Sequence, residues 1–97
     1  MKVWVLRRAQ GDLTEIQNWL KLENPLAAER VLNHILDDIE GLGRLPKIGP
    51  VVKDPRLSLR GYRRLVCEHY LIFYRLRGQR VVVHRVLHAR RDWLRLV

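Results

Sequence analysis

The residues of this sequence best suited to chemistry are His88, Arg90 and Arg91, which directly follow an apolar run over residues 81–87. Cleavage of RNA without a metal ion needs a base for the 2′-hydroxyl, an acid for the leaving oxygen and cations that balance charge on the phosphorus. His88 could act as the base or the acid, and Arg75, Arg90 and Arg91 could supply the cations. The cluster therefore contains some of the catalytic groups that a metal-independent ribonuclease needs.

A structural role is the alternative interpretation of the same cluster. A histidine at the end of a strand can hydrogen-bond to backbone groups or to Asp92, and Asp92 can form an ion pair with Arg90 or Arg91. A metal-dependent nuclease would need clustered carboxylates, but residues 46–97 contain only three acidic side chains. We therefore expect no metal and no cofactor.

His34 and Asp38 are a second pair of interest, because side chains four residues apart lie on the same face of a helix. Two such residues with no third ligand nearby in the sequence are weak evidence for a metal site. We interpret them as an exposed helical pair. The single cysteine, Cys67, lies within an apolar strand pattern and is interpreted as a small buried residue rather than a reactive thiol.

The formal net charge of +9 is concentrated in the second half of the chain. Residues 1–45 hold six Lys or Arg and seven Asp or Glu, a net charge of −1, whereas residues 46–97 hold thirteen and three, a net charge of +10. The positive electrostatic potential of such a charge attracts a polyanion such as nucleic acid, or an acidic protein. A basic surface without a specific partner is the third interpretation.

Hydrophobic periodicity predicts the elements that position these residues. The predicted strands are Lys2–Arg7, Tyr62–Cys67, Tyr70–Leu76 and Val81–Leu87, with residues 57–59 as a candidate edge strand. The predicted helices span about Ala9–Leu22 and from Pro25 up to Gly41 and Gly43. We expect a single α+β domain over residues 1–97. In it, an N-terminal strand and an antiparallel helical hairpin pack on a mostly antiparallel sheet of four or five strands.

Three residues in the first half of the chain have more specific roles in this prediction. Trp4 is expected in the core, and Trp19 is expected to widen the apolar stripe of the first helix. Asn24, placed before Pro25, is expected to cap the second helix by accepting a hydrogen bond from a free backbone amide.

The hairpin formed by the last two strands sets which side chains share a face. A turn at Gly78-Gln79 would pair Arg75 with Val82 and Phe73 with His84. One face of the sheet would then carry Leu71, Phe73, Arg75, His84 and His88, with Val82 and Val86. The other face, assigned to the helices because it is more apolar, would carry Ile72, Tyr74, Leu76, Val81, Val83 and Leu87, with Arg85 as an unexplained charge.

Several blocks of the sequence resemble one known family in their order and spacing. The blocks are Ala9 with Asp12-Leu13 and Ile16, Pro25 with Ala27-Ala28 and Arg30, Leu45-Pro46 with Gly49, Arg63-Arg64-Leu65, Phe73-Tyr74-Arg75, and Val86-Leu87-His88-Ala89-Arg90-Arg91-Asp92. Together they resemble the ParE/RelE superfamily of small bacterial toxins, which belong to type II toxin–antitoxin systems. The last block is the most telling.

The last two blocks look most like the ParE branch, whose members poison DNA gyrase by trapping it on cleaved DNA. This resemblance implies a gyrase inhibitor that acts by binding and takes part in growth inhibition and plasmid stabilisation. The target-binding candidates are Arg64, Arg75, His88, Arg90, Arg91 and Trp93.

The RelE branch provides the alternative, a ribosome-dependent endoribonuclease that cuts messenger RNA. Its candidate catalytic residues here would be His88, Arg91, Arg64 and Arg75. Leu71 stands where that branch would have an arginine, which argues against cleavage. A third hypothesis is a member without toxicity that is kept as an antitoxin-binding or DNA-regulatory module.

In all three cases the resemblance implies a cognate antitoxin that wraps the toxin in a hetero-oligomer. The basic second half suits an acidic wrapping segment. The sequence has no run of about 20 apolar residues, the length of a membrane span, so we expect no membrane association. Arg7 and Arg8 interrupt the short apolar stretch near the N-terminus, so we expect no secretion signal and a cytoplasmic protein.

Overall fold

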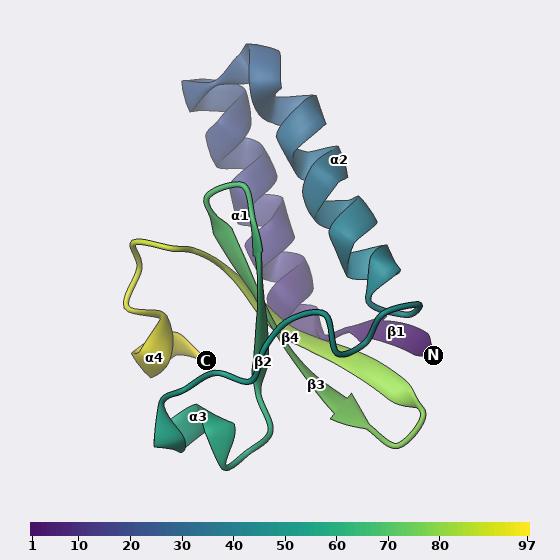
Figure 1. Cartoon of the computed structure of the whole chain (residues 1–97). Helices are drawn as coiled ribbons and strands as arrows, with labels where there is room; N and C mark the ends of the chain where they lie inside the picture. Colours follow the sequence, from purple (N-terminus) through teal and green to yellow (C-terminus); the bar gives the residue numbers. More distant parts are fainter.

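A computed structural model describes all 97 residues and shows two long helices packed on one face of a four-stranded sheet (Figure 1). The elements are β1 (Lys2–Val5), α1 (Arg7–Glu23), α2 (Pro25–Gly41), α3 (Pro55–Ser58), β2 (Arg63–Cys67), β3 (Tyr70–Arg77), β4 (Arg80–His88) and α4 (Trp93–Leu96). The strand order is β1-β4-β3-β2, with β1 parallel to β4 and the other pairs antiparallel. The predicted α+β architecture is confirmed.

The candidate edge strand at residues 57–59 is wrong. Pro55–Ser58 form the short helix α3, and the Asp54 side chain accepts a hydrogen bond from the Arg56 amide at 2.9 Å. An aspartate followed by a proline is a helix-start signal, because the proline gives up only an amide that would have had no partner. This local signal outweighs the apolar pair Leu57 and Leu59.

The helical hairpin of α1 and α2 is confirmed, although α1 begins at Arg7, two residues before the predicted start. The predicted cap by the Asn24 side chain is wrong. The Asn24 side chain makes no capping hydrogen bond, and its backbone oxygen accepts from the Ala27 amide at 3.1 Å instead. Neither helix, nor any other in the chain, is long and apolar enough to cross a membrane.

A β-bulge between β3 and β4 changes the predicted register. The pairs nearest the turn are as expected, including Arg75 with Val82, but Phe73 pairs with Arg85 and not with His84. One extra residue on β4 reverses the side-chain alternation beyond it. The predicted faces of the last residues of β4 are therefore wrong, since Val86 packs among the helix-facing side chains and Leu87 among those of the opposite face.

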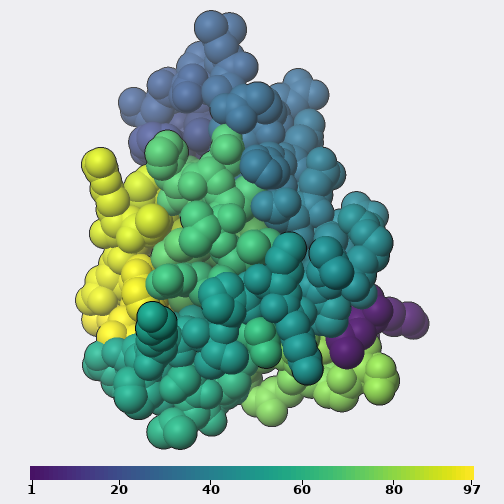
Figure 2. All heavy atoms as spheres, in the orientation of Figure 1, coloured from purple at the N-terminus to yellow at the C-terminus, as the bar shows by residue number.

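Both faces of the sheet are covered. The helix-facing cluster consists of Ala9, Ile16, Leu20, Val31, Ile35, Ile39, Leu42, Cys67, Tyr70, Ile72, Tyr74, Val81, Val83 and Val86. The opposite cluster consists of Val52, Leu57, Tyr62, Leu71, Phe73 and Leu87, and Trp93, Leu94, Leu96 and Val97 of the C-terminal tail pack against it. Figure 2 shows the yellow tail lying against the green strands and the teal segment that contains α3. The face predicted to be open is thus a second, smaller core.

The prediction that Trp4 lies in the core is wrong, and Trp19, which was expected to widen the apolar stripe of the first helix, is only partly covered. Trp4 is 49% exposed and Trp19 is 53% exposed. Strand alternation turns Val3 and Val5 toward the helices and Trp4 to the other side, where its ring lies 4.5 Å below the Arg80 guanidinium. Trp19 lies at the margin of the apolar stripe of α1, next to the buried Leu20.

A buried ion pair between Asp12 and Arg85 joins α1, β4 and the tail. The Asp12 carboxylate accepts from Arg85 Nε and Nη2, both at 2.8 Å, and from the Val86 amide at 3.0 Å. Arg85 Nη1 donates to the Leu96 carbonyl at 2.8 Å. Both charges are removed from water, and both are satisfied by several hydrogen bonds.

Breaking this pair should destabilise the fold strongly, because either partner alone would be a buried unpaired charge. We expect Asp12→Ala and Arg85→Ala each to lower the free energy of unfolding by about 3 kcal/mol or more in urea denaturation. The double variant should lose much less than the sum, with a coupling of about 2 kcal/mol. The exposed Glu15→Ala is the matched control on α1, and additive losses at Asp12 and Arg85 would contradict the pairing.

Candidate functional site

A cavity of about 500 Å³ opens between α1 and the far end of β4. It forms because β1 ends at Val5 while β4 continues to His88, which leaves the edge of β4 without a neighbouring strand. Two acidic side chains of α1 line one side and the basic residues after β4 line the other. The full lining is Asp12, Glu15, Ile16, Trp19, Tyr70, Val86, Leu87, His88, Arg90 and Arg91.

Three of the predicted site residues, His88, Arg90 and Arg91, therefore lie together. Arg90 and Arg91 are exposed in the turn between β4 and α4, and neither has an ion-pair partner within the chain. Their guanidinium groups are free to bind carboxylates or phosphates in a bidentate geometry. This end of the sheet is a basic surface beside the acidic side chains of Asp12 and Glu15 on α1.

His88 is held in one orientation by its neighbours. Its Nδ1 accepts the Arg90 amide hydrogen at 3.1 Å, so in the neutral ring the proton is on Nε2. The ring packs edge-on against Tyr70 and stacks on His69, with centroids 5.4 Å and 6.2 Å away. Burial, and then the charges of Arg90 and His69, lower the pKa of His88. The predicted backbone hydrogen bond is confirmed, and the neutral imidazole presents an Nε2–H donor.

Asp92 does form an ion pair, but not with either of the two predicted partners. Asp92, directly before the short helix α4, pairs with Arg95 of that helix at 3.2 Å rather than with Arg90 or Arg91. Residues three apart on one helical turn face each other, whereas immediate neighbours in sequence do not. The consequence is that Arg90 and Arg91 remain available to a partner.

Arg64 and Trp93 lie together at a different place, on the face of the sheet opposite α1 and α2. The Trp93 ring packs against Phe73, with centroids 5.4 Å apart. The Arg64 guanidinium lies 5.3 Å from the Trp93 ring centroid. This cation–π contact fastens the start of α4 to the sheet, so Trp93 positions the tail and Arg64 covers it.

Arg75 is engaged by two aromatic neighbours on that same face. Its Nε–H donates to His84 Nε2 at 3.2 Å, and its guanidinium lies 4.7 Å from the Tyr62 ring centroid. Because Nε2 of His84 accepts, the ring proton lies on Nδ1, 3.4 Å from the Tyr62 hydroxyl. Burial, followed by the charges of Arg75 and Arg77, lowers the pKa of His84 to about 4.

The candidate nuclease residues therefore do not converge. The bulge turns His88 to the helix-facing side, beside Tyr70, and leaves Arg64 and Arg75 on the other face. Arg75 is also five residues along β3 from Tyr70, which pairs with His88, a separation of roughly 17 Å at about 3.3 Å per residue. Only His88 and Arg91 of the proposed catalytic set share a site.

Sequence reasoning missed the other seven residues of the cavity, among them the polar or aromatic side chains of Asp12, Glu15, Trp19 and Tyr70. A signal for Asp12 was present, because it is three residues after Ala9 and four before Ile16, within the apolar stripe of α1. An acidic residue in that stripe and Arg85 in an apolar strand together indicate a buried pair. No comparable signal places Tyr70 beside His88, since the pairing of these two residues depends on the bulge in β4.

The environment of His84 predicts a specific pH dependence. A histidine that stays neutral in the folded protein but ionises in the unfolded chain near pH 6.5 makes the fold less stable as the pH falls from about 6.5 to about 4. We expect an NMR titration to give His84 a pKa of about 4, and His84→Gln to reduce the loss of stability in that window. An NMR pKa near 6.5 would contradict the Arg75–His84 contact.

Comparison with known proteins places this geometry in a family. Residues 3–93 match the family model described as the ParE toxin of the type II toxin–antitoxin system parDE. The chain is 30% identical over 82 residues to Toxin RelE3 of Caulobacter vibrioides, an alignment that covers 84% of this chain and 87% of the relative.

A solved structure titled as the chromosomal ParDE toxin–antitoxin system from P. aeruginosa has the same fold. The TM-score is 0.77 at 20% sequence identity, and the match covers 91% of this chain and 95% of that one. The family match over nearly the whole chain agrees with the predicted resemblance. This chain is a member of the ParE toxin family of type II toxin–antitoxin systems.

Proposed function

We propose that this toxin inhibits DNA gyrase by binding to it or to its cleaved DNA, and that Arg90, Arg91 and His88 make the essential contacts. The observation that carries the proposal is the pair of exposed arginines without intramolecular partners at the rim of the cavity. Guanidinium groups free of ion pairs bind phosphates and carboxylates without first breaking an internal contact. The net charge of +10 over residues 46–97 would speed encounter with an acidic surface or with DNA.

Binding explains the arrangement better than catalysis does. A metal-independent ribonuclease needs a base, an acid and cations within reach of one phosphate. Here Arg75 is held by His84 and Tyr62, and Arg64 lies over Trp93, both on the sheet face opposite His88. The residues that remain in the cavity are suited to recognition.

Ribosome-dependent cleavage of messenger RNA is the second candidate function. His88 and Arg91 do line one cavity, and a 30% identical relative carries the name Toxin RelE3. The neutral His88 ring, with its Nε2–H, could donate a proton to a leaving oxygen. This reading needs a general base that the cavity would have to obtain from the ribosome or from the RNA.

We also propose that a cognate antitoxin neutralises the toxin in a hetero-oligomer, and that it covers the cavity. Trp19 lines the cavity and is half exposed, and Leu22, one turn further along α1, is 81% exposed. A partner segment with apolar side chains for this strip and acidic side chains for Arg90 and Arg91 would match both features. Such a segment would compete directly with gyrase for the basic rim. A gyrase inhibitor of this kind would act in the cytoplasm.

Removing the two arginines tests the gyrase proposal. In a reaction with purified gyrase and plasmid, we expect the toxin to accumulate cleaved DNA. The double variant Arg90→Ala and Arg91→Ala should need at least about tenfold more protein, since each charged hydrogen bond contributes about 1.5 kcal/mol or more.

The matched control is Lys2→Ala, which removes an exposed positive charge from β1, at the other side of the molecule in Figure 1. Equal unfolding midpoints of the variants would show that folding is retained. Unchanged supercoiling by gyrase, together with cleavage of messenger RNA at codons on translating ribosomes, would overturn the proposal in favour of ribonuclease activity. In that case His88→Ala should abolish cutting.

A tryptophan pair tests the antitoxin surface. We expect Trp19→Ala to weaken binding of the antitoxin, produced from the reading frame adjacent to the toxin gene, by about 30-fold or more, as for a central tryptophan in an interface. Trp4→Ala is the control, because Trp4 has nearly the same exposure, 49% against 53%, but lies outside the cavity. Calorimetry measures both, and equal affinities for the two variants would exclude the cavity as the antitoxin surface.

A further inference from the structure

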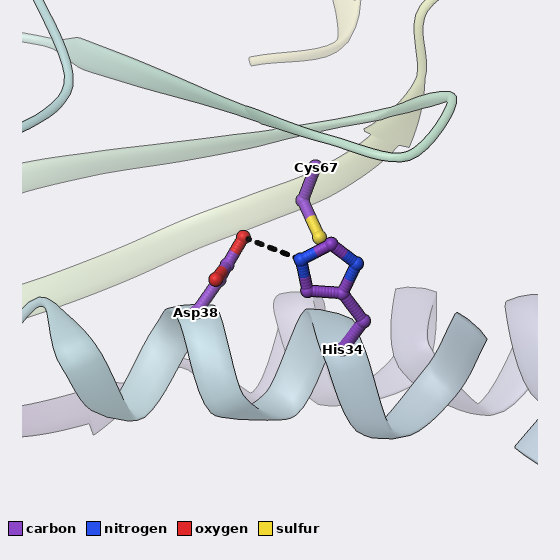
Figure 3. A group of neighbouring side chains, drawn as sticks. All are labelled: His34, Asp38 and Cys67. Carbon is purple, nitrogen blue, oxygen red and sulfur yellow. Dashed lines mark ion pairs between the residues drawn. The ribbon is translucent and has the colours of Figure 1, made fainter. Parts of the chain in front are cut away.

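A second group of chemically capable side chains lies away from the cavity, where α2 faces the end of β2. His34 and Asp38 project from one face of α2, and Cys67 ends β2 directly above them (Figure 3). One ligand atom from each of the three residues lies within 4.8 Å of the other two. The sequence offered His34 and Asp38 without a third ligand, and the fold supplies it.

We propose that His34, Asp38 and Cys67 bind a divalent zinc ion that links α2 to β2. The set combines one imidazole nitrogen, one carboxylate oxygen and one sulfur, which suits the borderline softness of zinc better than that of magnesium or calcium. Bonds of about 2.0–2.3 Å in a tetrahedral site place the ligand atoms roughly 3.3–3.8 Å apart. Small rotations of the two helical side chains would bring the present group to that spacing.

Accessibility favours entry of the ion from solvent. The side chains of His34 and Asp38 are 48% and 31% exposed, whereas Cys67 is buried at the bottom of the group. The sulfur would therefore be the inner ligand, and the fourth position would point outward to water. Zinc binding would replace the S–H bond of Cys67 by a Zn–S bond and release the thiol proton to solvent.

Glu68 supplies the outer contact that histidine ligands of zinc usually have. Its Oε2 lies 3.4 Å from His34 Nδ1, while Asp38 Oδ2 lies 3.6 Å from His34 Nε2. A carboxylate at Nδ1 places the ring proton there and leaves the Nε2 lone pair on the side of Asp38, where it could bind the ion. Arg30 holds Glu68 from the other side at 2.8 Å and lowers its pKa.

The backbone conformation of Glu68 indicates that the fold constrains its position. Glu68 is the one non-glycine residue of the chain with a positive φ, at 55°. This conformation is unfavourable for a glutamate, which has no short side chain to hydrogen-bond locally. The turn between β2 and β3 holds it and thereby sets Cys67 and Glu68 on the same side, facing α2.

The proposal is independent of the gyrase proposal, and binding of metal alone tests it. Zn²⁺ added to the purified full-length toxin should bind at one equivalent and raise the midpoint of thermal unfolding by about 5 °C or more. Co²⁺ in place of Zn²⁺ should give the near-ultraviolet charge-transfer absorption of a thiolate ligand, and Cys67→Ser should remove it.

Variants on the exposed face of α2 keep the test valid if Cys67→Ser does not fold. His34→Gln and Asp38→Asn should each weaken Zn²⁺ binding by at least tenfold. Glu68→Gln should weaken it by about 10–100-fold while keeping the cobalt absorption. Asp37→Asn, an exposed neighbour on α2, is the matched control and should bind as the unchanged protein does. Absence of the thiolate absorption, or equal affinities in Asp38→Asn and Asp37→Asn, would overturn the site.

Discussion

The ion pair between Asp12 and Arg85 is the interaction on which the rest of this structure depends. Burying two charges is costly, and the cost is offset here because the carboxylate accepts three hydrogen bonds and the guanidinium also reaches the Leu96 carbonyl. The pair fills the edge of β4 beyond the end of β1 and ties α1 to the tail. It therefore sets both walls of the cavity that presents Arg90 and Arg91.

The β-bulge in β4 is the second constraint, and it explains why Arg85 is available for that pair. With strict alternation Arg85 would point into the apolar face under α1 and α2, where it has no room. The extra residue moves Arg85 toward the edge, turns Val86 into the main core and brings His88 to the same side as Tyr70. A local irregularity in one strand thus decides which side chains form the site.

Hydrophobic periodicity was sufficient for the helical hairpin, the four strands and the overall packing, because those patterns extend over many residues. It failed where a single residue changes the geometry. The sheet face on which His88 lies depends on the bulge, and the helix α3 depends on the helix-start signal Asp54-Pro55. Trp4 is exposed because strand alternation turns it away from the helices and no other element covers it. His88, Arg90 and Arg91 could be grouped from sequence since they are neighbours in the chain. The burial of Cys67 and the shared face of Arg75 and His84 also followed from strand periodicity. The contact of Arg64 with Trp93 and the approach of Cys67 to α2 could not be predicted, because those partners are distant in the sequence.

We propose that the toxin contacts gyrase through the rim of the cavity beside β4. Hydrogen–deuterium exchange of the toxin, with and without gyrase on cleaved DNA, tests the claim directly, since it reports which backbone amides a partner protects. We expect new protection at residues 86–93 and at the part of α1 that lines the cavity, with α2 and β2 unchanged. Protection confined to α2 and β2, or no protection with gyrase but clear protection with ribosomes, would contradict it.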